Sequence, residues 1–268
     1  YLKMNVLEIT TYKVGGVSTH VAEFVKRMKS KAIILTGSSN KSGYEKENGL
    51  NFYHIPVFIP IQDIYFINKP GSYKKVQKVL DKKNINLIHI HGPLFTFINK
   101  TIKRCNRPIV FTTHYVLDFE GNRVLSFFYK RLIKYVTKKT AKKVDKIICV
   151  NKGYVKKYTQ WGVDKDKLTY IPNGVDTEKF SPGKSNIKEK LDCKNLLIFW
   201  GRLGYQKNTQ MLIKAFKKLK TKDTKLVIIG EGPDLEKLKK LSGGNKNIIF
   251  TGFLPEKDLL NYARAADI

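Results

Sequence analysis

The sequence predicts an α/β protein made of two doubly wound parallel-sheet domains, the second of them incomplete. Short apolar runs of strand length alternate with helix-like runs along the whole chain, which is the pattern of parallel sheets covered by helices. The 268 residues leave room for two domains, and a hydrophobic content of 42% is enough for two cores. Glycine-containing loops follow several apolar runs, as they do at the ligand-binding edge of open α/β sheets.

The first half of the chain supplies six apolar runs that we expect to be strands. They are residues 6–9, 32–35, 51–55, 87–91, 108–113 and 146–150. Apolar residues at helical spacing predict helices after Gly16, over 71–82 and over 154–161. The apolar stretch 59–70 contains prolines at both ends and is expected to be a loop.

The second half repeats the alternation with three further strands and three helices. Strands are expected at 196–200, 225–229 and 247–251, and helices at 208–220, 233–242 and 255–266. Pro172 and Asn173-Gly174 mark a turn, and the boundary is placed between domains 1–182 and 183–268. Asp267-Ile268 should open a fourth strand, so we expect the sequence to be a fragment of a longer polypeptide.

The charge of the chain points to anionic partners, because the formal net charge is +29. Residues 126–160 hold eleven Lys and Arg against one acid, which predicts a basic amphipathic helix. The apolar stripe of this helix, which is Phe127, Phe128, Leu132, Ile133 and Val136, is expected to pack inward. Contact with an anionic membrane is the main alternative. Specific nucleic-acid binding is not expected, since no base-reading motif is present.

Other bulk features limit the class of protein. No run of eighteen apolar residues is present, so we expect no membrane-spanning helix. Cys105, Cys149 and Cys193 lie far apart, which disfavours a disulfide framework and suits a reducing cytosol.

Two loops carry residues suited to binding a diphosphate. Arg202 and Lys207 follow the strand at 196–200, where arginine offers a fork of donors and lysine a point charge. Gly15-Gly16 follows the first strand and precedes a helix, so backbone N–H groups could approach a phosphate closely. Glu231, in Gly230-Glu231-Gly232-Pro233, either accepts hydrogen bonds from hydroxyls or only favours a helix N-terminus.

Histidines mark the same edge of the first predicted sheet. His114 stands at the exit of a strand, where it could contact a sugar hydroxyl or take a proton. His89 and His91 lie two positions apart, so they share one face of their predicted strand. With His114 they could form a three-histidine zinc site. No carboxylate or cysteine is seen to support such a site, so no metal is expected.

Taken together, these motifs resemble the retaining glycosyltransferases of family 4, which have the GT-B fold of two Rossmann-like domains. The resemblance covers nearly the whole chain and rests on eight motifs in order. They are residues 15–21, 91–93, 113–114, 147–151, 171–176, 201–208, 230–233 and 252–255.

The resemblance implies transfer of a sugar from a UDP- or GDP-linked donor, with retention at the anomeric carbon and no cofactor or metal. It assigns catalysis to His114, Arg202 and Lys207, and acceptor binding to His20 and His91. It assigns donor binding to Gly15, Gly16, Arg202, Lys207, Gly230, Glu231 and Leu254. The N-terminal domain would build the acceptor site, and the C-terminal domain would bind the nucleotide sugar.

One departure from the family matters for activity. The family has a pair of glutamates beyond the strand that Asp267-Ile268 would start. We therefore expect an active parent enzyme and an inactive or weakly active fragment. The alternatives are a non-catalytic basic membrane- or nucleic-acid-binding protein on this scaffold, and a sugar-nucleotide epimerase relative.

The expected acceptor is a glycan or a lipid-linked molecule. The apolar stretch Ile59–Ile67, together with the high charge, suggests a lipid-linked one at an anionic membrane. The expected location is the cytoplasm, extended to peripheral attachment at the cytoplasmic face of the membrane.

Overall fold

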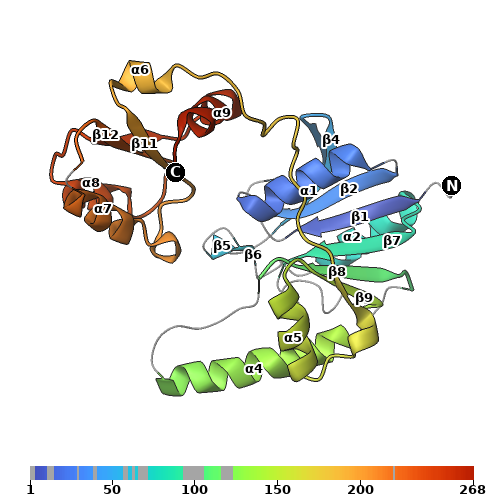
Figure 1. Ribbon diagram of the computed structural model, residues 1–268. Helices are drawn as coiled ribbons and strands as arrows, with labels where there is room; N and C mark the ends of the chain where they lie inside the picture. Colours follow the sequence, from blue (N-terminus) through green and yellow to red (C-terminus); the bar gives the residue numbers. More distant parts are fainter. Residues whose placement is uncertain are drawn as a thin grey trace. The chain divides into compact units, whose positions relative to one another are not determined.

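The structure is a computed structural model that describes residues 4–10, 15–28, 30–38, 41–56, 60–61, 64–65, 72–92, 106–115, 123–219 and 221–268. It divides into two compact units, residues 1–173 and 174–268 (Figure 1). Each unit is an α/β structure, as the alternating pattern predicts. The domain boundary predicted after residue 182 stays a prediction.

The first unit contains ten strands, four helices and one short 3₁₀ turn among its described residues. They are β1 (Asn5–Thr10), α1 (Gly16–Arg27), β2 (Lys31–Ser38), β3 (Gly43–Glu47), β4 (Leu50–Pro56), β5 (Pro60–Ile61), β6 (Ile64–Tyr65), α2 (Ser72–Lys82), β7 (Leu87–His91), β8 (Ile109–Thr113), α4 (Arg123–Ala141), β9 (Lys146–Cys149), α5 (Lys152–Gln160), η1 (Lys165–Lys167) and β10 (Leu168–Tyr170).

Eight of these strands form one sheet in the order β10-β9-β8-β7-β1-β2-β4-β3 (Figure 1). All neighbours are parallel except β3, which pairs antiparallel with β4 at the edge. The charged run of β3 and the three residues of β10 carry no strand-like apolar run, so neither was predicted. Both lie at sheet edges, where a strand needs only one neighbour.

The two faces of this sheet are covered differently. Leu7 and Ile9 of β1 belong to a large apolar cluster that also contains buried residues of α2 and α5. A smaller cluster packs Val21 and Val25 of α1 against Ile34 of β2. Because side chains alternate along a strand, Glu8 points away from the large cluster, toward the face that α1 covers.

Helix α4 corrects the expectation that its aromatic stripe packs inward. Ile133 is buried, but Phe127 is 55% exposed, Phe128 64% and Leu132 57%. The inward face is instead completed by the buried residues Thr137, Thr140 and Ala141. Ala141 belongs to the large apolar cluster of the sheet, and the bulky side chains are left exposed to solvent. The stretch 59–70, predicted to be a loop, contains the two short paired strands β5 and β6, and its other residues lie outside the described residues.

The second unit contains a three-stranded parallel sheet in the order β11-β12-β13. Its elements are α6 (Ile187–Leu191), β11 (Asn195–Trp200), η2 (Tyr205–Lys207), α7 (Thr209–Lys218), β12 (Thr224–Ile229), α8 (Leu235–Ser242), β13 (Ile248–Gly252) and α9 (Glu256–Ala265).

Helices cover both faces of this second sheet. One apolar cluster joins Ile213 of α7 and Leu238 of α8 to the sheet. The other joins Ile187 of α6 and Ala265 of α9 to the opposite face. At the free edge of β11, Asp267 N donates to Leu196 O at 2.9 Å, and Ile198 N donates to Ile268 O at 2.9 Å. The backbone of Asp267-Ile268 thus pairs with β11 in the manner expected of a further strand.

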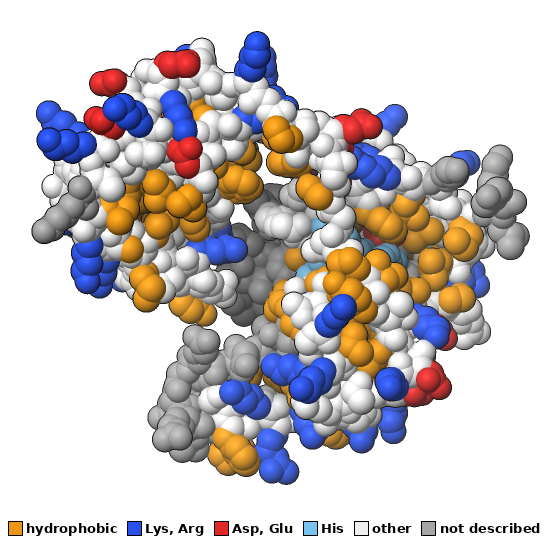
Figure 2. Space-filling model, viewed as in Figure 1, with side chains coloured by type: hydrophobic (Ala, Val, Ile, Leu, Met, Phe, Trp, Pro, Cys, Tyr) orange, Lys and Arg blue, Asp and Glu red, His pale blue; other side chains and the backbone are white. Residues whose placement is uncertain are grey.

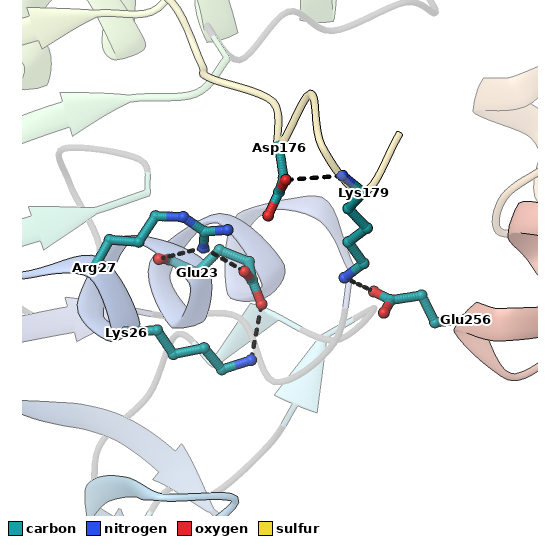
Figure 3. Close-up of polar contacts among 6 residues, drawn as sticks. All are labelled: Glu23, Lys26, Arg27, Asp176, Lys179 and Glu256. Carbon is teal, nitrogen blue, oxygen red and sulfur yellow. Dashed lines mark hydrogen bonds and ion pairs between the residues drawn. The ribbon is translucent and has the colours of Figure 1, made fainter. Parts of the chain in front are cut away.

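The segment that begins the second unit is attached to α9. Lys179 forms an ion pair with Glu256, while its backbone N–H donates to Asp176 Oδ1 at 3.0 Å (Figure 3). Farther along, Ser185 Oγ donates to Asn261 O at 2.8 Å. Within the part of the chain that the structure describes, no helix has the length and apolar character needed to cross a membrane.

Candidate functional site

The first unit gathers polar side chains at the carboxyl edge of its sheet. Glu8 lies opposite His89 in the β1–β7 register, and both point to the face that α1 covers. His91 ends β7, and His114 follows the last residue of β8. His20 comes from the second turn of α1. The sheet and one helix thus bring together a carboxylate and four imidazoles from four segments.

A continuous set of short contacts links these groups. His91 Nε2 lies 2.8 Å from Glu8 Oε2, and His89 Nδ1 lies 3.1 Å from the same oxygen. On its other side, His91 Nδ1 lies 3.1 Å from His114 Nε2. His89 Nε2 lies 2.7 Å from Thr112 Oγ1. Glu8 and His91 are fully buried.

Burial and these contacts fix the charges of the cluster. Burial acts to raise the pKa of Glu8, but the hydrogen bonds from His89 and His91 outweigh it and hold that pKa at about 2. Burial lowers the pKa of His91 to about 4, against the raising effect of Glu8. Burial and the neighbouring imidazoles lower the pKa of His114 to about 3. At neutral pH Glu8 is therefore a carboxylate, and His91 and His114 are neutral.

His20 completes the cluster from the helix side. Its ring lies edge-on to His114 with centroids 4.8 Å apart, and 5.7 Å from the ring of His91. The nitrogens that His20, His91 and His114 offer lie within 4.8 Å of one another, as do the ligand atoms of Glu8, His89 and His91. Either set could hold a transition metal, since neutral imidazole and carboxylate are zinc ligands. The combination of His89, His91 and His114, which the sequence analysis weighed as a zinc site and did not expect, is thus divided between two sets.

Glu8 is the residue that sequence analysis missed. The reasoning against a metal was that no carboxylate accompanied the histidines, and the structure supplies one. A signal was present, because an acid within the apolar run Val6-Leu7-Glu8-Ile9 is unusual in a buried strand. Such a residue needs a partner, and its partners here lie more than eighty positions away.

Gly15 and Gly16 lie where the sequence places them, between β1 and α1. Gly15 has φ 106°, which favours glycine, and its carbonyl accepts from Thr19 N at 3.1 Å. A Cβ at either position would meet nothing within 4 Å. The start of α1 therefore presents open space next to backbone N–H groups.

In the second unit, three loops after the strands are tied together by their backbones. Gly201 N donates to Ile229 O at 3.0 Å, Leu203 N to Glu231 O at 2.8 Å, and Gly230 N to Gly252 O at 2.8 Å. The loops approach so closely that a Cβ on Gly230 would lie 2.1 Å from Gly201 O. A Cβ on Gly232 would likewise lie 2.2 Å from Leu203 O, so backbone contact between loops requires glycine at positions 230 and 232.

These tied loops present the predicted donor-binding residues of the second unit. Arg202 and Lys207 are both exposed on the loop between β11 and α7, and Lys207 lies in η2. Glu231 is exposed on the next loop, and Leu254 is half-buried on the third. The structure therefore groups Arg202, Lys207, Glu231 and Leu254 at one edge of one sheet. The roles assigned to these residues, and to those of the first unit, stay predictions.

Two protein families match the chain in succession. Residues 14–179 match the family described as Glycosyltransferase Family 4, and residues 181–268 match Glycosyl transferases group 1. These matches confirm the resemblance found in the sequence.

Individual relatives agree with the family matches. The chain is 24% identical, over 96% of its length, to the GPI3 subunit of phosphatidylinositol N-acetylglucosaminyltransferase from Saccharomyces cerevisiae, of which it spans 59%. It is 30% identical, over 95% of its length, to the uncharacterized glycosyltransferase MJ1069 of Methanocaldococcus jannaschii, of which it spans 70%.

A solved structure supports the fold class. The crystal structure of Anabaena Alr3699/HepE in complex with UDP and glucose matches 98% of this chain and 72% of its own, with a TM-score of 0.72 and 15% identity. This likeness confirms the predicted α/β fold of the GT-B type.

Proposed function

The chain belongs to glycosyltransferase family 4, and from that membership we propose that the protein moves a sugar from a nucleotide-sugar donor to an acceptor with retention of anomeric configuration. The observation that carries the proposal is the carboxyl edge of the second unit's sheet. Backbone hydrogen bonds join its glycine-containing loops, and Arg202 and Lys207 on these loops are exposed to solvent. Exposed cations on a rigid loop at the carboxyl edge of a parallel sheet suit a diphosphate. The UDP named with the Anabaena structure fits this chemistry.

In this proposal Arg202 and Lys207 hold the diphosphate and stabilise the negative charge that develops on it as the sugar leaves. Gly15 and Gly16 offer backbone N–H groups to a phosphate of the donor. Gly230, Glu231 and Leu254 complete the donor site, with the backbone of Leu254 meeting the base. His114 contacts the transferred sugar, and His20 and His91 belong to the acceptor side. The leaving phosphate assists deprotonation of the acceptor on the same face of the sugar.

We further propose that the acceptor is lipid-linked and is reached at the cytoplasmic face of an anionic membrane. The support comes from the outer side of α4, where Phe127, Phe128, Leu132 and Tyr135 are all more than half exposed. Exposed cations, including Arg131 and Lys134, lie between these side chains. Figure 2 shows blue Lys and Arg side chains beside orange hydrophobic ones at the lower edge of the view, where α4 lies.

The hollow next to this surface has the same character. Arg131, Lys134 and Lys138 of α4 line it together with Tyr135 and Trp161. Aromatic rings suit the membrane interface and cations suit anionic headgroups. Phosphatidylinositol, which appears in the name of the yeast relative, is an anionic lipid of this kind.

Donor binding is tested by calorimetric titration of the 268-residue chain with UDP- and GDP-linked sugars. Arg202→Ala should weaken binding about 10-fold to 100-fold, since a hydrogen bond to a charged group contributes about 1.5–3 kcal/mol. Lys214→Ala removes one positive charge from an exposed position on α7 and should leave the affinity unchanged. Equal weakening by both substitutions would show only a bulk charge effect. Absence of binding to every sugar nucleotide would favour the non-catalytic scaffold.

Turnover is tested separately, because the chain spans 59% of the yeast relative's length. We propose that the 268-residue chain transfers sugar weakly or not at all by itself. Sugar transfer by the purified chain at a rate ordinary for an enzyme would contradict this part of the proposal and leave the donor site standing.

Membrane contact is tested by sedimentation with vesicles of phosphatidylcholine, with and without phosphatidylglycerol. Binding should require the anionic lipid and weaken with salt. The pair Phe128→Ser and Leu132→Ser should reduce partitioning about 10-fold or more, because each apolar side chain loses about 1.5–3 kcal/mol of burial. Met211→Ser changes a side chain that is 64% exposed on α7 and serves as the control. Unchanged vesicle binding of the α4 variant would refute the proposal that this side of α4 contacts the membrane.

A further inference from the structure

The histidine cluster contains a directional line of hydrogen bonds that starts at Glu8. The Glu8 carboxylate is ionised at neutral pH, so it can only accept hydrogen bonds. Both groups that contact Oε2, His91 Nε2 at 2.8 Å and His89 Nδ1 at 3.1 Å, must therefore be N–H donors.

This requirement fixes the tautomer of His91. A neutral imidazole carries one N–H, and its other nitrogen is an acceptor. Because His91 is buried and neutral, with Nε2 donating to Glu8, its Nδ1 must be a lone pair. The group 3.1 Å from that lone pair is His114 Nε2, which must then be the N–H donor of this contact.

The same step repeats at His114. This ring is also neutral, so an N–H at Nε2 leaves Nδ1 as a hydrogen-bond acceptor. The branch through His89 ends differently. Its Nδ1 donates to Glu8, and its Nε2 lies 2.7 Å from the Thr112 hydroxyl. Only the branch through His91 leads from the carboxylate to His114.

We propose that Glu8 and His91 are positioning residues that hold His114 in the Nε2–H tautomer, so that His114 Nδ1 accepts a hydrogen bond from a sugar hydroxyl. The assignment of a sugar hydroxyl rests on the proposed function, whereas the tautomer does not. A buried carboxylate thus determines which atom His114 presents, without touching the ligand itself. No proton leaves Glu8 or His91 in this arrangement.

The alternative use of the same atoms is a metal ion held by His20, His91 and His114. In that case His91 Nδ1 and His114 Nε2 would both be lone pairs directed at the metal. Two nitrogens bound to one zinc ion would lie about 3.3 Å apart, because each Zn–N distance is about 2.0–2.1 Å, so the 3.1 Å contact fits either use. The two uses differ in the proton on His114 Nε2 and in the response of the rings to added Zn²⁺.

The test is nitrogen-15 NMR of the imidazole rings in the 268-residue chain at neutral pH. We expect His91 and His114 to show protonated Nε2 and unprotonated Nδ1. A protonated Nδ1 on His114 in the unaltered protein would overturn the proposal without any variant. Addition of one equivalent of Zn²⁺ should leave the nitrogen-15 resonances of both rings unchanged. A joint shift of the resonances of His20, His91 and His114 would overturn the proposal in favour of a metal site.

The variant Glu8→Leu removes the acceptor that orients the line. His91 Nε2 then has no carboxylate to donate to, so the proton of this ring can move to Nδ1 and donate to His114 Nε2, which makes His114 the Nδ1–H tautomer. We expect both rings to change together. Thr112→Val removes the hydroxyl from the other branch of the same cluster, and should leave both tautomers as they are. Retention of both tautomers in Glu8→Leu, or equal changes in both variants, would contradict the proposal.

Kinetics separate this inference from the proposed function. Where the protein turns over, Glu8→Leu should lower kcat about 10-fold to 100-fold with little change in KM for the donor, because His114 Nδ1 is no longer held as an acceptor for the sugar hydroxyl. An unchanged kcat despite altered tautomers would remove the sugar hydroxyl from the proposal. Failure of donor binding in the unaltered protein would instead refute the proposed function.

Discussion

The first unit holds Glu8, His89 and His91 at the carboxyl edge of its sheet as buried side chains, whereas the second unit presents Arg202 and Lys207 there as exposed ones. In the first unit, side chains contact one another across strands, and burial keeps His91 and His114 neutral. In the second, backbone contacts between glycines set the shape of the edge. The charges of the second unit lie in water and avoid the cost of desolvation.

Similar edges of parallel sheets can thus be organised in two ways. One edge depends on which side chains meet across strands, and the other depends on how closely the backbones of its loops approach. Substitutions and pH should therefore affect the two units differently.

The largest expected effect comes from Gly230→Ala in the second unit. The new Cβ would lie 2.1 Å from Gly201 O, on a residue with φ 128°, so the loops must separate. We expect the second unit to lose about 4 kcal/mol or more of unfolding free energy, measured by hydrogen exchange of β11 and β12.

Gly204→Ala is the matched control in the same loop. Gly204 has φ −147° and ψ 164°, and a Cβ there would meet nothing within 4 Å. The unfolding free energy of the second unit should change by less than about 1 kcal/mol in this variant. Equal exchange rates in the two variants would mean that the glycine contacts do not hold the edge together.

The next largest effect is that of acid on the first unit. Burial lowers the pKa of His91 from 6.5 to about 4 and that of His114 from 6.5 to about 3. Between these values the unfolded chain binds more protons, so stability present above pH 6.5 falls as the pH falls. From pH 7 to 5 each histidine should remove about 2 kcal/mol of unfolding free energy.

The second unit is the internal control for this prediction. All five histidines lie between residues 20 and 114, so hydrogen exchange of β11 and β12, corrected for its intrinsic pH dependence, should change little. Glu8 adds a separate loss below pH 4.5, since its folded pKa is about 2. Equal destabilisation of both units between pH 7 and 5 would show that buried histidines are not the cause.

The smallest effect is expected for Glu23→Gln on α1. The hydrogen bonds from Lys26 and Arg27 lower the pKa of Glu23 to about 2, the same value as for the buried Glu8. Glu23 is 36% exposed, however, and its partners are about half exposed (Figure 3). Solvent screens such pairs, so thermal melting should show a loss below about 1 kcal/mol that disappears in high salt. A loss well above about 1 kcal/mol, or one that persists in high salt, would refute the distinction between the two carboxylates.

Local patterns in the sequence were enough to predict most strands and helices. The apolar runs at 196–200, 225–229 and 247–251 correspond to β11, β12 and β13, and the resemblance to family 4 follows from short motifs. Elements without an apolar run, such as β3, β10 and α6, were not predicted, because their stability comes from an edge or a neighbouring helix.

The alternation of strands and helices, the family, and the position of Arg202 and Lys207 on a loop after a strand could all be predicted from the sequence. The contacts of Glu8 with His89 and His91, and the exposure of Phe128, became visible in the tertiary structure alone. Periodicity is a local property, because it is set by neighbours three or four positions away. Contacts across eighty positions, and the choice of which helix face is buried, depend on strand order and on how side chains pack between layers.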